Sequence, residues 1–397
     1  MTTATSPARV GATVGLLMAA MGAATLAPVA VGIVATFIID DLGISRSALG
    51  WIAATNVVIA AALSPVAGST TDRVGGKAAL VAVFVTSAAA FAVFGTAPGI
   101  ATMLVGSAIA AFAQAGGNPS TNTVIRDLMD PGRRGVVTGL KQSGVQITIA
   151  IAGLTMPAIA LTYGWRSSMM LVAMGVLLCG VAAMVLVDGS TTPDDAPPPG
   201  WRGVLPPSTW WLAAYGCVFG FAGSIAFFVA LYAEEAIGLD PRIGGAVVAF
   251  TGIVAFVARI AWARYAEVRH SYRRPLATMA LLGAAAGLAM VGATSAAWLI
   301  WVGAVLTGLS TSAWNSVGML AVINESGGAT GRSSGIVLLG FLTGLGIGPP
   351  IYGAIIDAQG SYHAAWLLSV ATSIVSFGVI AAWRRETQVR THPDATA

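Results

Sequence analysis

The chain has 397 residues, of which 56% are hydrophobic and only 9% are charged, and its mean hydropathy is +0.82. Soluble domains carry about 25% charged residues. The composition therefore excludes an ordinary soluble enzyme, a disordered chain and a nucleic-acid-binding protein, despite a pI near 9.3 and a net charge of +4. The two cysteines, Cys179 and Cys217, both lie in apolar runs, which excludes a disulfide framework and a cysteine metal site. These values predict an all-α protein that crosses a membrane many times.

Apolar runs in chain order predict the individual spans, because a helix needs about 20 predominantly apolar residues to cross the hydrocarbon core. Ten stretches lack Asp, Glu, Lys and Arg: 10–39, 47–71, 78–125, 142–165, 167–187, 203–233, 243–258, 275–324, 333–356 and 358–383. Two are twice as long as a span and are expected to break at the turn-forming residues 97–99 and 294–295. The short 243–258 run is expected to continue through Arg259 to about Trp262. The sequence thus predicts twelve transmembrane helices, the first being a span rather than a cleaved signal peptide.

The Lys and Arg residues predict the orientation of these spans. With both termini inside, fifteen of the 20 lie on the cytosolic side and three lie in external loops, as the positive-inside rule requires. A polar, proline-rich stretch over 188–207 follows the sixth span. We therefore expect a six-helix bundle over 1–187, a cytosolic linker over 188–207, and a second six-helix bundle with a short cytosolic tail over 208–397. The protein is expected to be a monomer in the cytoplasmic membrane.

The two halves resemble each other at an offset near 197 residues. The matched positions are Gly106 with Gly303, Asn118 with Asn315, and Trp165 with Tyr362. Duplicated six-helix halves are typical of transporters whose substrate site lies near the membrane midplane between the halves. The predicted fold is therefore two pseudo-symmetric bundles of six helices.

The gap between the second and third spans holds the sequence GSTTDRVGGK at 68–77. This sequence resembles the cytosolic loop signature of the major facilitator superfamily, Gly-x-x-x-Asp-Arg-x-Gly-x-Lys/Arg. Gly68 would permit close helix approach, Gly75 a tight turn, and Asp72 pairing with a cation or a helix end. The resemblance implies alternating access by rocking of two bundles, with a conformational latch formed by Gly68, Asp72, Arg73, Gly75 and Lys77. A degraded copy of the motif lies at 263–269 in the second half.

A second motif, rich in glycine and proline, runs from Gly335 to Gly353 in the eleventh span. It is similar to a motif that antiporters of the superfamily carry in the fifth helix, whereas here it lies in the repeat-related helix. We favour close helix packing with a proline kink as its role. The run from Gly348 to Tyr362 is also loosely similar to the monocarboxylate and cyanate-type branches of the superfamily.

Ionisable residues inside the spans indicate the charge of the substrate. Lys141 and Arg259 lie within spans, toward the cytosolic third, from where long cationic side chains can also reach the interface. All 16 acidic residues lie at span ends or in loops. A cavity with two cations and no central carboxylate favours an anion. The candidates for proton coupling are Glu234, Glu235 and Asp357, for which solvation at an external helix end is the alternative.

Uncharged polar residues complete the candidate substrate site. Gln114, Asn118 and Asn122 share one face of the fourth span. Gln146 of the fifth span and Asn315 of the tenth span are the further candidates, and interhelical hydrogen bonding is the alternative role for all of them.

Together these patterns predict secondary active transport of a small organic anion, such as a monocarboxylate, by alternating access. Proton coupling stays open, and proton-coupled drug efflux is the alternative function. No phosphate-binding loop is present, and no cofactor, metal or nucleic-acid partner is expected. A membrane enzyme would need a catalytic constellation within a span, which the charged residues do not supply.

Overall fold

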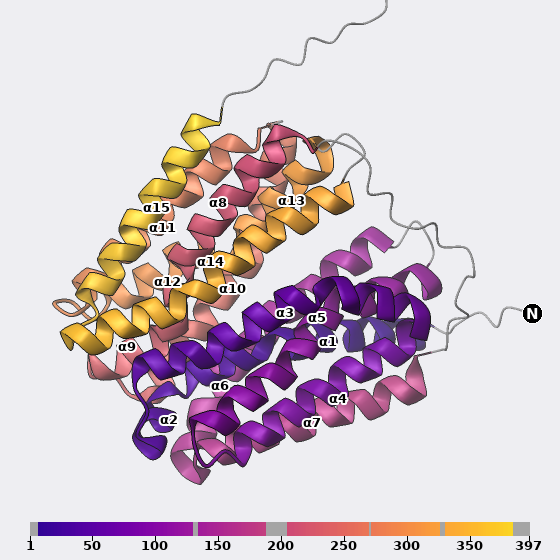
Figure 1. Ribbon diagram of the computed structural model, residues 1–397, viewed down its shortest axis with the longest axis horizontal. Helices are drawn as coiled ribbons and strands as arrows, with labels where there is room; N and C mark the ends of the chain where they lie inside the picture. The colour runs from indigo at the N-terminus through magenta and orange to yellow at the C-terminus, as the bar shows by residue number, and fades with distance from the viewer. Residues whose placement is uncertain (1–6, 130–133, 188–204, 270, 326–329, 384–397) are drawn as a thin grey trace, which may run out of the picture.

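The computed structural model describes residues 7–129, 134–187, 205–269, 271–325 and 330–383, and these residues form helices without strands (Figure 1). The elements are α1 (Pro7–Ile33), α2 (Ala35–Leu42), α3 (Arg46–Val74), α4 (Gly76–Gly95), α5 (Ile100–Leu128), α6 (Arg134–Tyr163), α7 (Trp165–Leu186), α8 (Pro207–Gly223), the 3₁₀ helix η2 (Ser224–Phe228), α9 (Val229–Glu235), α10 (Pro241–Val268), α11 (Arg273–Ala293), α12 (Leu299–Leu309), α13 (Trp314–Glu325), α14 (Thr330–Gln359) and α15 (His363–Ala382).

The predicted spans are confirmed, and three of them contain an interruption: the first between α1 and α2, the seventh at η2, and the tenth between α12 and α13. Within the described residues, eleven helices are long and apolar enough to cross a membrane. The tenth predicted span consists of α12 and α13, each too short to cross alone, and the two together supply the twelfth crossing. The breaks expected at 97–99 and 294–295 lie between α4 and α5 and between α11 and α12. The helix expected to pass through Arg259 continues to Val268.

Helices α1–α7 pack as one bundle and α8–α15 as the other, which confirms the predicted fold (Figure 1). Two helix pairs make the most extensive contacts between the bundles, α3 with α14 and α6 with α10. In the second pair the Gly245 position lies against the Gly153 carbonyl, and Gly252 lies against the Gln146 carbonyl. The pair is therefore antiparallel, and glycine allows its backbones to meet. The linker predicted over 188–207 lies outside the described residues up to 204, so the domain limits remain a prediction.

The division of the tenth span has a local cause. Ser310 ends α12 with φ −114° and ψ −96°, which interrupts the helical hydrogen bonds. A carbonyl freed inside a membrane needs another donor. Two side chains of α10 each provide a hydrogen-bond donor. Trp262 Nε1 donates to Leu309 O over 2.9 Å, and Arg259 Nε donates to Ser312 O over 3.0 Å. The broken helix thus depends on α10.

The glycines of the eleventh span form a packing stripe, as predicted. Helix α14 lies against α8 and η2 through positions where a side chain would meet neighbouring atoms. The contacts are Gly340 with Ala213, Gly344 with Cys217, and Gly348 with Ser224. Close packing between helices therefore accounts for this motif.

A methyl group at Gly344 is expected to lower the stability of the fold. The Cβ of Gly344→Ala would overlap the Cys217 carbonyl, and overpacking typically costs about 1–3 kcal/mol. The unfolding temperature of the purified protein measures the effect. Gly378→Ala in α15 is the control, since no atom of another described helix lies within 4 Å of its Cβ position. Equal unfolding temperatures for the two variants would contradict the packing role.

The predicted latch is described only in part. Gly75 has φ 84° and joins α3 to α4, so the expected tight turn is present. Among the described residues no neighbouring atom lies within 4 Å of the Cβ position of Gly68, so the expected close helix approach there stays a prediction. Arg73 and Lys77 flank the turn, in the last turn of α3 and at the start of α4. The side chain of Asp72 lies outside the described residues, so the latch itself remains a prediction.

Candidate functional site

A cavity of about 230 Å³ lies between the two bundles. Its walls come from α1, α3 and α6 of the first bundle and from α8, η2, α9, α10, α11, α12 and α14 of the second. Most lining groups are apolar, and the polar ones are Gln146, Ser224, Thr251, Thr307 and Ser312. A largely apolar pocket with a few polar groups is typical of a small-molecule site.

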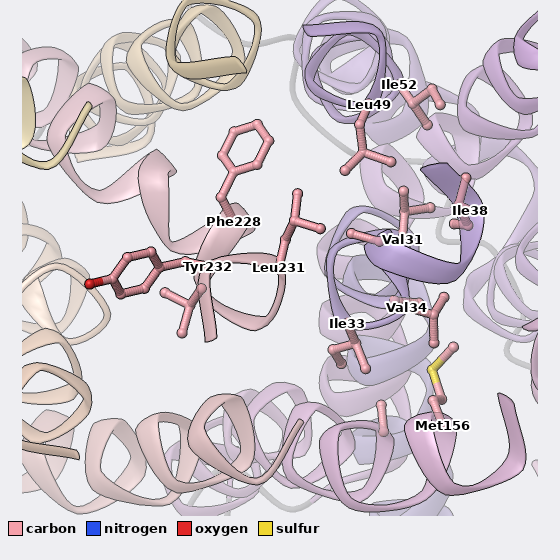
Figure 2. Close-up of a cluster of buried hydrophobic side chains, with 14 of the residues drawn as sticks. Val31, Ile33, Val34, Ile38, Leu49, Ile52, Met156, Phe228, Leu231 and Tyr232 are labelled. Carbon is pink, nitrogen blue, oxygen red and sulfur yellow. The ribbon is translucent and has the colours of Figure 1, made fainter. Parts of the chain in front are cut away.

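A layer of buried apolar side chains closes one side of this cavity. We call it the apolar layer, and it contains Val31, Val34, Ile38, Leu49, Ile52, Phe228, Leu231, Tyr232, Tyr352 and Ile356. Figure 2 shows Phe228, Leu231 and Tyr232 of the second bundle on one side and Val31 and Leu49 of the first bundle on the other. The layer belongs to both bundles and separates the cavity from the end of the molecule where α2 and α9 lie (Figure 1).

Beyond the apolar layer, Arg46 of α3 binds carboxylates of the second bundle. Its Nε and Nη2 donate to the two carboxylate oxygens of Glu235 over 2.8 and 2.7 Å. Asp357 accepts from the backbone N–H groups of Arg46 and Ser47 over 3.1 and 2.8 Å, at the positive end of α3. Tyr362 Oη donates to Glu235 over 2.5 Å. We call these groups the Arg46 network, and they join the bundles at this end.

The Arg46 network places two of the proton-coupling candidates, Glu235 and Asp357, in ion pairs with one arginine. Burial, followed by the hydrogen bond to Glu235, raises the pKa of the Tyr362 hydroxyl well above its ordinary value, so Tyr362 stays a donor. The third candidate, Glu234, is half-buried, and neither of its carboxylate oxygens accepts a hydrogen bond within the described residues. The hydroxyl of Thr36 is a polar neighbour of this carboxyl group.

Matched contacts at the same end show the internal repeat. Trp165 Nε1 donates to Asp41 over 3.3 Å in the first bundle, as Tyr362 donates to Glu235 in the second. Trp165 and Tyr362, which were predicted to correspond in the internal repeat, therefore also make corresponding contacts.

Arg259 lies beside the cavity on the side away from the apolar layer. Its Nε donates to the carbonyl of Ser312, a residue that lines the cavity. Its two Nη atoms have no hydrogen-bond or ion-pair partner within the described part of the chain. The guanidinium group is therefore fixed through its Nε, and the N–H groups of both Nη atoms remain available to bind another group.

Lys141 lies in the first bundle, and its side chain is fully buried. Its Nζ donates to Thr121 Oγ1 over 2.8 Å, to Asn122 Oδ1 over 2.5 Å and to Asn118 Oδ1 over 3.3 Å. Gln142 Nε2 donates to the same Asn118 oxygen over 3.0 Å. We call this group the Lys141 cluster. Its ligands are all uncharged.

The antiparallel pairing of α6 with α10 relates the two cations. Continued in the same register, it places Lys141 and Arg259 at about the same level, one in each bundle. Gln146, which lines the cavity, lies five residues further along α6 than Lys141, or about 7.5 Å. Both cations therefore lie on the same side of the cavity, opposite the apolar layer.

The remaining predicted site residues are not brought together. Gln114 and Asn315 do not line the cavity, and each has a buried side-chain oxygen without a hydrogen-bond partner in the described residues. Sequence reasoning missed Arg46 and Tyr362 as partners of the acidic residues, although Tyr362 appeared in the repeat. Thr121 was also missed, because a threonine inside a helix gives no signal in a single sequence.

Two membrane-spanning bundles with a cavity between them define the fold of a secondary transporter. The family model described as the Major Facilitator Superfamily matches residues 12–327, so the chain belongs to this superfamily of transporters and is not an enzyme. Its members bind small-molecule substrates in the membrane.

One known transporter is similar along most of the chain and another along part of it. A probable nitrate/nitrite transporter, NarK2 of Mycobacterium tuberculosis, is 27% identical over 383 residues, covering 90% of this chain and 92% of its own. The class B tetracycline resistance protein of Escherichia coli is 32% identical over 117 residues, covering 29% of this chain and 28% of its own.

Solved structures agree on the fold. A bacterial homologue of the human lysosomal transporter Spinster, inward-facing and occupied, matches with a TM-score of 0.76 at 15% identity, covering 95% of this chain and 97% of its own. The nucleoside transporter NupG, in a mutant form, matches with a TM-score of 0.74 at 11% identity, covering 94% of this chain and 99% of its own.

Proposed function

We propose that the protein transports a small monovalent anion, such as a monocarboxylate, across the cytoplasmic membrane by alternating access, with both termini cytosolic. The observation that carries this proposal is the charge beside the cavity. Within the described residues, neither Lys141 nor Arg259 has a carboxylate partner. A cation inside a membrane that no acidic residue neutralises attracts an anionic ligand.

The Arg259 fork supports the same proposal. Two free Nη donors beside a cavity wall match the two oxygens of a carboxylate or of a nitrate-like anion. The similarity to a probable nitrate/nitrite transporter over 90% of the chain extends the substrate class to inorganic anions of this shape.

Drug efflux is the second candidate, because the cavity walls are mainly apolar and part of the chain is similar to a tetracycline resistance protein. It gives no role to the two cations, which would repel the lipophilic cations that such exporters often carry.

Uptake by reconstituted vesicles tests the two candidates together. The panel is labelled acetate, lactate, nitrate and nitrite, each with and without a pH gradient, and a lipophilic cation and tetracycline for efflux. We expect uptake of at least one anion above that of empty vesicles. Efflux of the drugs without uptake of any anion would reject the proposal in favour of the second candidate.

We assign proton coupling to Glu234, because a carboxyl group outside an ion pair can gain and lose a proton without breaking one. The charged groups that act on it are the carboxylates of Glu235, Asp240 and Asp40. In Glu234→Gln we expect anion uptake to lose its dependence on the pH gradient, while exchange of labelled for unlabelled anion continues. Glu267→Gln, an exposed residue of α10, is the control. Gradient-driven uptake by Glu234→Gln at the wild-type rate would show that Glu234 is not the coupling group.

A further inference from the structure

In the Lys141 cluster, the chemistry of the ammonium group determines which groups donate hydrogen bonds and which accept them. An ammonium group has three N–H donors and no acceptor. All three donors of Lys141 are used, on Thr121, Asn122 and Asn118. Lys141 therefore has no hydrogen left for a substrate, and its influence on a substrate passes through its neighbours.

Because Lys141 only donates, both asparagines must turn their oxygens toward it. A side-chain amide has its oxygen and its NH₂ group on opposite sides. The NH₂ groups of Asn118 and Asn122 therefore point away from the buried ammonium. Gln142 fixes Asn118 further, because its Nε2 donates to the same oxygen. Thr121 holds the cluster on α5 through its own bond to Gly117 O over 2.7 Å.

The two asparagines are accessible although Lys141 is not. Asn118 and Asn122 are exposed, whereas Lys141 is completely buried behind them. They do not share the face of α5 that carries the exposed apolar residues Val105 and Phe112. At about 100° per residue, Asn118 lies about 120° and Asn122 about 80° around the helix from Phe112. Their amides thus project away from the apolar face of α5.

We propose that the amide NH₂ groups of Asn118 and Asn122 form the anion-binding half-site of the first bundle, and that Lys141 is a positioning residue that orients both amides and polarises them. This inference rests on the proposed function and names its binding groups. A buried charge that donates to two carbonyl oxygens makes the attached NH₂ groups stronger donors. The half-site presents these two amides as donors, and so fits a carboxylate or nitrate and rejects a cation.

Substitution of Asn122 by aspartate tests the role of the amide NH₂ group separately from the role of the amide oxygen. The aspartate keeps an oxygen for Lys141 but replaces the outward NH₂ donor with a second, negatively charged acceptor. We expect Asn122→Asp to unfold at or above the wild-type temperature in the absence of anions. We expect it to bind nitrate and acetate at least about tenfold more weakly, as the loss of a donor to a charged ligand predicts.

The binding assay is the rise in unfolding temperature of the purified full-length protein with nitrate or acetate at constant ionic strength. Lys141→Met, which removes the positioning group, is expected to weaken binding by a similar factor. The charge-matched control is Asn324→Asp in α13, an exposed residue whose Nδ2 donates to Tyr272. It is expected to bind both anions like the wild type.

The outcomes distinguish this inference from the proposed function. Wild-type protein that neither anion stabilises, or Asn122→Asp that binds both anions like the wild type, overturns the half-site even if vesicles take up anions. The expected binding pattern in a protein whose vesicles take up no anion supports the half-site and rejects the transport function.

Discussion

Arg46→Ala is expected to move the protein toward a conformation that is open at the Arg46 end, by at least about tenfold in the ratio of open to closed molecules. The variant loses two hydrogen bonds to Glu235, and hydrogen bonds to charged groups contribute about 1.5–3 kcal/mol. The Arg46 and Glu235 side chains are 32% and 20% exposed, so screening favours the lower value. About 1.4 kcal/mol corresponds to a tenfold change in population.

A cysteine placed in the apolar layer measures this shift. Ile38 is fully buried, so the rate at which Ile38→Cys reacts with a maleimide reports opening, once Cys179 and Cys217 are replaced by serine. Arg166→Ala is a matched control at the same end. It removes an ion pair with Asp41 that lies within the first bundle and does not bridge the bundles. Equal labelling rates in Arg46→Ala and its parent would show that the network does not hold this end closed.

The fold was predictable because its strongest determinant is local. An apolar run of spanning length between polar gaps predicts a helix in a membrane regardless of its neighbours. This is why the passage of α10 through Arg259 was confirmed. The turn at Gly75 was also predictable locally, because glycine readily adopts a positive φ. The break at Ser310 was missed because it needs donors from another helix, Trp262 and Arg259, and a single sequence does not show that proximity.

The candidate site was predictable in composition but not in arrangement. The residue types at Lys141 and Arg259 indicated cations without acidic partners, and the structure agrees within the described residues. The sequence could not show that Lys141 uses all three of its N–H donors on neighbouring side chains, while the two Nη atoms of Arg259 remain available. Nor could it show that Glu235 binds Arg46, since that contact joins residues far apart in the chain.

Arg259→Ala is expected to lower anion uptake by about 100-fold. Loss of one partner from a desolvated charge pair costs about 2–5 kcal/mol, and about 2.8 kcal/mol corresponds to 100-fold. The assay is initial uptake of whichever labelled anion the wild type transports, in vesicles with equal amounts of protein. Arg242→Ala is the control, because Arg242 is an exposed cation at the other end of the same helix. Normal uptake by Arg259→Ala would show that the anion does not use this charge.

Two further variants separate the charge of Arg259 from its support of the broken helix. Glutamine can still donate a hydrogen bond toward the Ser312 carbonyl but carries no charge, whereas lysine keeps the charge but not the fork. If Arg259 served only to satisfy that carbonyl, Arg259→Gln would restore both stability and uptake. Because we assign its free Nη atoms to the anion, we expect Arg259→Gln to unfold near the wild-type temperature and yet transport as poorly as Arg259→Ala. Arg259→Lys is expected to retain partial uptake, since a single ammonium attracts the anion without binding both of its oxygens.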